Sequence, residues 1–140
     1  MPTNSTFVDT PYYVLMGGRQ ILGPEVSSLP SGKQCVAIFG FSDKESYDKF
    51  CEKGQTALLP YPLTKVYLRE RVDAPGDSLN LVVVNAVGPQ ERCLRAGTME
   101  AVLQGQEERT LHVTAAYELT FDPESAGYQV NVNKHLKTGR

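Results

Sequence analysis

The sequence has no tryptophan, three cysteines and two histidines, and these shortages limit the chemistry that it can support. Cys35, Cys51 and Cys93 are odd in number and far apart, with no CxxC pair, which argues against a disulfide framework and a zinc site. A cysteine nucleophile would need a base such as His112 or His135, and we expect these thiols to be buried and inert. The sequence therefore predicts no metal and no cofactor, and it leaves open whether these five side chains have a chemical role.

An excess of one charge and long apolar runs are also missing. The formal net charge is -2, whereas domains that bind nucleic acid by bulk electrostatics carry a marked basic excess, so nucleic acid is not an expected partner. No apolar run approaches the roughly 18 residues of a membrane span, and residues 1–6 lack the basic and then apolar layout of a secretory signal. We therefore expect a cytoplasmic protein without membrane contact.

Motifs for nucleotide binding or acid–base catalysis are likewise absent. Met16-Gly17-Gly18-Arg19 has neither the GKS/T ending of a phosphate-binding loop nor the spacing GxGxxG, and it predicts a tight turn. Glu118, Asp122 and Glu124 surround an expected hairpin turn, where acids commonly serve turn formation and solubility. Whether the protein is an enzyme stays open at this point, and the sequence favours one that is not.

The strongest pattern present is an alternation of apolar and polar residues over 110–133. Apolar residues occupy the odd positions from Leu111 to Phe121, and polar residues fill most of the even ones. Residues 122–127 supply turn chemistry, and alternation resumes from Tyr128. The pattern predicts a long C-terminal hairpin with one buried face and one solvated face.

Two segments carry helix signals. Ser42-Asp43-Lys44-Glu45 matches a capping box and precedes apolar residues at helical spacing, which predicts a helix over 43–53 that ends at Gly54. Thr98 can cap a second, weaker helix over 99–104, with Gly105 as its stop and a charged turn over 106–109.

Strands complete the expected fold. Apolar runs predict buried strands within 34–41 and 79–87, and shorter strands are expected near residues 12–16 and 21–22. These segments together predict an α+β fold with a mainly antiparallel sheet of about five to seven strands. We expect a flexible leader over 1–11, one globular domain over 12–133 and a basic tail over 134–140.

Two stretches are candidate binding surfaces. Residues 64–72 alternate as an exposed strand would, and one strand face would present Lys65, Tyr67, Arg69 and Arg71. Three cations and an aromatic ring suit an acidic partner, although polar positions on a strand are commonly just solvated. In residues 58–63, Leu59 and Tyr61 lie beside prolines and would form a preorganised ridge for a partner, with ordinary core packing as the alternative.

Residues 36–45, a strand that ends in an aromatic residue followed by serine and acids opening a helix, resemble the strand–helix unit of SseB-type proteins. These proteins are linked to enhanced serine sensitivity and type III secretion. Val84-Asn85 before Gly88-Pro89 is similar to a later strand and turn in that family. The resemblance covers a small part of the chain, and it implies a non-enzymatic interaction module.

These observations favour a non-enzymatic protein-interaction domain of unknown partner. The partner would be another protein, with an acidic surface as one option and a homodimer through an exposed hairpin edge as another. The alternative is a small-ligand-binding or enzymatic domain whose cleft is assembled from residues distant in sequence. A flat apolar patch would favour the first, whereas a deep pocket that gathers His112, Glu118 and the stripe around Arg69 would favour the second.

Overall fold

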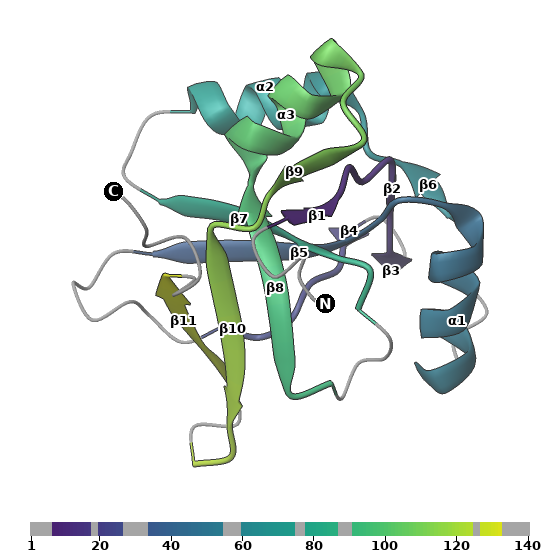
Figure 1. Ribbon diagram of the computed structural model, residues 1–140. Coiled ribbons are helices and arrows are strands. Elements are labelled where there is room, and N and C mark those ends of the chain that lie inside the picture. Colours follow the sequence, from purple (N-terminus) through teal and green to yellow (C-terminus); the bar gives the residue numbers. More distant parts are fainter. Residues whose placement is uncertain are drawn as a thin grey trace.

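A computed structural model of the chain describes residues 7–17, 20–26, 34–54, 60–74, 78–86, 91–124 and 127–132. Its centre is a seven-stranded sheet with the order β11-β10-β8-β7-β5-β2-β6 (Figure 1). These strands are β2 (Tyr13–Val14), β5 (Cys35–Phe41), β6 (Tyr61–Pro62), β7 (Leu79–Val84), β8 (Cys93–Thr98), β10 (Tyr117–Asp122) and β11 (Gly127–Val132). Neighbours are antiparallel except for β5 and β7, which are parallel. The α+β class with a mainly antiparallel sheet is confirmed.

Two small sheets extend this architecture. Strand β3 (Met16–Gly17) pairs with β4 (Gln20–Ile21), and β1 (Phe7–Asp9) pairs with β9 (His112–Thr114). The side chains of Val8 and Thr10 are buried, and the Thr10 backbone N–H donates to the Leu111 carbonyl at 3.0 Å. The expected flexible leader therefore does not hold for residues 7–11, because this segment completes a sheet. Residues 1–6 and the expected tail over 134–140 lie outside the described residues.

Helix α1 (Lys44–Gly54) confirms the first helix prediction, with its cap one residue later than expected. Asp43 is the capping side chain, because its Oδ1 accepts a hydrogen bond from the Ser46 backbone N–H at 2.8 Å. The capping box at Ser42 is wrong, since Ser42 is engaged elsewhere. Its N–H donates to Oδ1 of Asn85 at 2.9 Å, and its Oγ accepts from Nδ2 of Asn85 at 2.9 Å.

Helix α3 (Met99–Glu108) confirms the second helix prediction and is longer than expected. Thr98 caps it, with its side chain accepting from the Ala101 N–H at 3.1 Å. Gly105 is buried inside the helix and not at its end, and the helix ends at Arg109, whose φ of 58° is left-handed. The expected turn over 106–109 is wrong, because residues 106–108 continue the helix and Arg109 is its C-cap.

Helix α2 (Lys65–Asp73) replaces the strand expected over 64–72, and that prediction is wrong. Thr64 caps α2 by accepting from the Tyr67 N–H at 3.1 Å, and Leu68 is fully buried one turn into the helix. Although the residues alternate in polarity, the Thr64 cap and the burial of Leu68 where α2 packs against α3 stabilise the helix.

The C-terminal hairpin is confirmed for β10 and β11, in which Leu119 lies opposite Val130. The preceding residues are a separate element, because the chain leaves the sheet at Ala115 and Ala116 and β9 pairs with β1 instead. Leu111 at the start of the expected strand is 80% exposed. The prediction of one continuous strand from 110 to 121 is therefore wrong.

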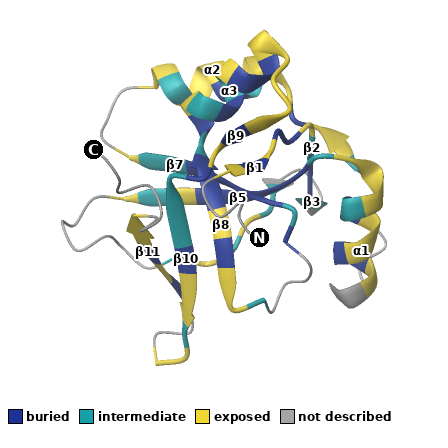
Figure 2. Ribbon diagram, in the orientation of Figure 1, coloured by how far each residue is buried: buried dark blue, intermediate teal, exposed yellow. Residues whose placement is uncertain are grey.

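The central strands are covered on both faces, as the buried segments in Figure 2 show. One core packs α1 against the sheet, and it includes Phe39 and Phe50 with ring centroids 4.8 Å apart. The other core packs α2 and α3 against the opposite face around Ile38 and Val82. Because successive strand residues face opposite sides, β5 supplies both cores. Within the described residues, no helix is long and apolar enough to span a membrane.

Candidate functional site

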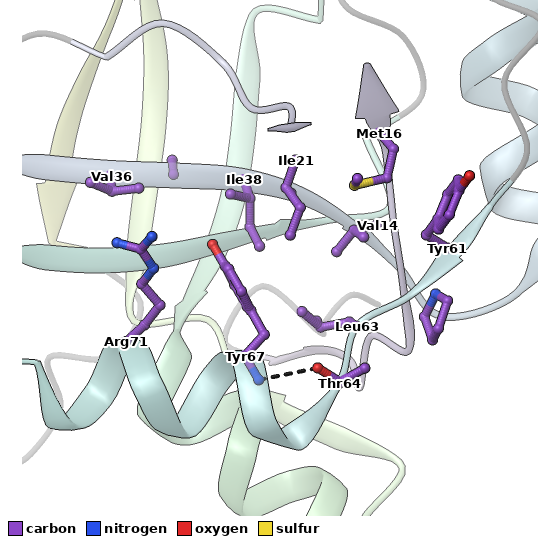
Figure 3. Close-up of a pocket in the computed structure, with 12 residues that line it drawn as sticks. Val14, Met16, Ile21, Val36, Ile38, Tyr61, Leu63, Thr64, Tyr67 and Arg71 are labelled. Atoms are coloured by element: carbon purple, nitrogen blue, oxygen red, sulfur yellow. Dashed lines mark hydrogen bonds between the residues drawn. The ribbon is translucent and has the colours of Figure 1, made fainter. Parts of the chain in front are cut away.

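A pocket with a volume of about 720 Å³ lies between β5 and α2, where the β3–β4 hairpin and β6 approach them (Figure 3). Pockets of roughly 300–1,000 Å³ are typical of small-molecule sites. The lining residues come from five parts of the chain: Val14, Met16, Ile21, Val36, Ala37, Ile38, Tyr61, Pro62, Leu63, Thr64, Tyr67 and Arg71.

The floor of the pocket is apolar because of strand alternation. Val36 and Ile38 share the face of β5 that looks toward α2, whereas Phe39 faces α1 on the other side of the sheet. Val14 and Ile38 are nearly inaccessible, and Val36 is 36% exposed at the pocket edge. The pocket is therefore continuous with the second core and opens toward solvent at β5.

One end of the pocket is polar. Tyr67 and Arg71 are four residues apart on α2, so they lie on the same helix face, and both side chains point from α2 toward β5 (Figure 3). The guanidinium carbon of Arg71 lies 5.6 Å from the centroid of the Tyr67 ring. Within the part of the chain that the structure describes, neither the Arg71 guanidinium nor the Tyr67 hydroxyl forms a hydrogen bond or an ion pair.

The structure separates the four residues of the expected stripe. Tyr67 and Arg71 line the pocket, whereas Arg69 lies on another side of α2 and forms an ion pair with Glu107 of α3. Lys65 is exposed and is not part of the pocket lining. The prediction that all four residues share one face was wrong because it assumed a strand. A helix instead brings residues four positions apart onto the same face.

The expected ridge is only partly described. Tyr61 lies in β6 at the end of the pocket opposite Arg71 (Figure 3), and its side chain is 49% exposed. Leu63 from the same stretch is buried and lines the pocket. Leu59 lies outside the described residues, so its predicted role in binding is not placed by the structure.

Sequence reasoning missed the rest of the lining. Met16 and Ile21 are paired in the β3–β4 hairpin, and their apolar character was a usable signal for a packed hairpin. No local signal places them at this pocket, because their position there depends on how the hairpin, β5 and α2 pack together.

The histidine and acid that were expected in a catalytic cleft lie elsewhere. Nε2 of His112 is 3.4 Å from Oδ1 of Asp9, and both side chains are about half exposed. His112 borders a separate depression of about 160 Å³ near α3, and Glu118 lies on β10. The 720 Å³ pocket includes neither of them.

The three cysteines are free, and the thiols of two of them have raised pKa values. Burial raises the pKa of the half-buried Cys35 thiol. Partial burial of the thiol raises the pKa of Cys93, although the residue as a whole is exposed, and the negative charges of Glu118 and Glu91 raise it further. Because the thiolate is the nucleophile, these environments disfavour thiol catalysis. Over the described ranges, no three His, Cys, Asp or Glu residues cluster as metal ligands would.

Comparison of the chain with protein-family models, with curated proteins and with solved structures found no significant match. The similarity of residues 36–45 to SseB-type proteins therefore remains a local resemblance, and the fold and the pocket are the basis for assigning a function.

Proposed function

We propose that the protein is a small-ligand-binding domain whose site is the pocket between β5 and α2. The proposal rests on one observation: the 720 Å³ pocket combines an apolar floor with the polar side chains of Tyr67 and Arg71. This is the second of the two functions considered from the sequence, and the concave shape of the site favours it over a flat contact surface.

The pocket is large for a packing defect. Protein interiors are close-packed, and voids larger than a water molecule are few in a domain. Here Val14, Ile38 and Leu63 are buried in the core and still line open space. An apolar ligand that covers them would gain the free energy of removing the remaining apolar surface from water.

Binding without catalysis is the activity that we propose. The two thiols with raised pKa values and the half-exposed His112–Asp9 pair do not lie at the pocket. The cytoplasm remains the proposed compartment, and three free cysteines support a reducing environment.

Nile red, a neutral apolar dye, tests the pocket directly through its rise in fluorescence on binding. We expect saturable binding at one dye per chain and its loss in Val36→Trp, because Val36 lines the pocket at its partly exposed edge. Val132→Trp is the matched control, since Val132 is an exposed strand valine outside the pocket.

Circular dichroism and the thermal midpoint Tm establish that both variants are folded. Equal dye binding by Val36→Trp and Val132→Trp, or no saturable binding by the unmodified chain, would contradict a small-ligand site in this pocket.

A second candidate function is the protein contact expected from the sequence. It is favoured by Tyr61 and Val66, which are 49% and 63% exposed and flank the start of α2. Light scattering on the chain purified from its native lysate would give the mass of any complex. A stoichiometric protein partner or a dimer that is lost in Val66→Lys supports this contact, and a monomer without a partner contradicts it.

A further inference from the structure

We infer that the ligand of this pocket is an amphipathic carboxylic acid, with its carboxylate on Arg71 and Tyr67 and its apolar body along β5. This inference rests on the proposed function, because it specifies the ligand class of the same site. It follows from three features of the lining, namely its single charge, the geometry of its donors and the arrangement of its apolar surface.

Arg71 is the one charged side chain among the lining residues that the structure describes, and no described residue supplies it with an acidic partner. By contrast, Arg69 on the same helix is paired with Glu107. A ligand with one negative charge would complete the pocket, and that charge would balance Arg71.

The donors at this end are suited to a carboxylate. The guanidinium carbon of Arg71 lies 5.6 Å from the Tyr67 ring centroid, and the guanidinium and the Tyr67 hydroxyl both lie on the side of α2 that faces β5 (Figure 3). An arginine fork binds the two oxygens of a carboxylate in parallel, and the Tyr67 hydroxyl supplies a further donor. A phosphate monoester carries about −1.5 to −2 charges at neutral pH, which one arginine does not balance.

The apolar body has a defined path. Figure 3 shows Arg71 near Val36 at one end of the pocket and Met16 and Tyr61 at the other, with Ile21 and Ile38 between them. The helix rises about 1.5 Å per residue, so α2 covers about 10 Å from Thr64 to Arg71. A short linear tail fits this path, and octanoate is a probe of suitable length.

The experiment is displacement of Nile red by octanoate and by octanol, which have similar tails and differ in the charge of the head group. At pH 7.5 octanoate is ionised, and we expect it to displace the dye at about a tenfold lower concentration than octanol, because a charge-assisted hydrogen bond contributes at least this factor.

Arg71→Gln should remove that advantage, because it should weaken displacement by octanoate far more than displacement by octanol. Tyr67→Phe should reduce the advantage by a smaller factor, because it removes one neutral donor and keeps the ring. Arg69→Gln is the matched control, since it removes an arginine from the same helix outside the pocket, and it should behave as the unmodified chain.

Each contrary result has one meaning. If the dye binds and both probes displace it equally, or neither displaces it, the inferred carboxylate is wrong while the small-ligand site stands. If Arg71→Gln weakens octanol as much as octanoate, Arg71 shapes the pocket and does not bind an acid, which also overturns the inference. Failure of the dye itself to bind contradicts the proposed function.

Discussion

Asp43 determines where α1 begins, and this role gives it a measurable effect on stability. Its carboxylate accepts the Ser46 N–H at 2.8 Å, one of the backbone donors that a helix start leaves without a partner. We expect Asp43→Ala to lower the free energy of unfolding by about 1 kcal/mol, as measured by urea denaturation. Asp43→Asn keeps the acceptor and should lose much less.

The same cap has a pH dependence of known sign. The hydrogen bond from the Ser46 backbone lowers the pKa of the Asp43 carboxyl in the folded state. A depressed folded pKa means that the contribution is present above the unfolded pKa of about 4 and is lost as pH falls through the folded value. The difference in stability between the unmodified chain and Asp43→Asn should therefore diminish in acid, and a difference that grows in acid would contradict this role.

Gly23 is exposed, yet a side chain cannot be added there without a clash. A Cβ at this position would lie 1.8 Å from the carbonyl oxygen of Ala37, which belongs to the β5 backbone. The neighbouring Leu22 carbonyl accepts from the Phe39 N–H at 3.0 Å and holds the two segments together.

We expect Gly23→Ala to destabilise the protein by about 1–3 kcal/mol, because the backbone of β5 cannot yield as a side chain would. The measurement is Tm by circular dichroism. An unchanged Tm would show that the segment after β4 is free to move away from β5.

At the scale of elements, Gln106 joins α3 to two other segments. This buried side chain donates from Nε2 to the Pro11 carbonyl at 2.9 Å and to the Leu63 carbonyl at 3.1 Å. Through Leu63, which lines the pocket, α3 supports the site that α2 and β6 form.

Gln106→Leu leaves two carbonyls without their donor, so we expect a loss of about 2 kcal/mol in the free energy of unfolding. Gln104→Leu is the matched control, because Gln104 is an exposed residue of the same helix whose amide contacts Glu108. Equal effects of the two substitutions on urea denaturation would show that the buried hydrogen bonds contribute little.

Elements with local signals were predictable, and elements defined by distant contacts were not. The Thr98 cap predicted α3, and the polar start at residues 42–45 predicted α1, although Asp43 and not Ser42 is its cap. Alternation followed by a turn predicted β10 and β11. The alternation at 64–72 was ambiguous, because Leu68 and Val72 also have helical spacing, and Thr64 was an available capping signal that went unused. The pairing of β1 with β9 joins residues about a hundred positions apart, and no local pattern contains it.

The candidate site was predicted in part and for a reason that was wrong. Tyr61, Tyr67 and Arg71 were singled out, and all three line the pocket. The sequence suggested a ridge and a strand face for them, whereas in the structure Tyr61 lies in the short strand β6 and Tyr67 and Arg71 lie on one face of helix α2. The apolar floor could not be inferred, because it exists only where β5, the β3–β4 hairpin and α2 meet.

At the scale of the molecule, one sheet serves two cores. Phe39 and Val83 belong to the core under α1, and Ile38 and Val82 belong to the core under α2 and α3. These residues alternate along β5 and β7, so both cores depend on the same two strands. Disruption of the strands in one core would therefore also disrupt the other core.

We therefore expect a single cooperative unfolding transition. Far-ultraviolet circular dichroism reports the backbone, and tyrosine fluorescence reports both Tyr47 in the first core and Tyr67 beside the second. The two probes should give coincident urea midpoints, as a two-state transition requires. Separate midpoints would show that the unfolding is not a single two-state transition and would contradict the shared sheet as the source of cooperativity.

The position of the pocket along the chain has a consequence for protein synthesis. The lining residues that the structure describes all lie between Val14 and Arg71, whereas the supporting hydrogen bond from Gln106 comes later, as does β9, the partner of β1. The ribosome synthesises the chain from its N-terminus, so these lining residues emerge before α3, the helix that supports them through Gln106. The core beneath the pocket also contains Met99 and Val102, so the complete site can form only after α3 has been synthesised.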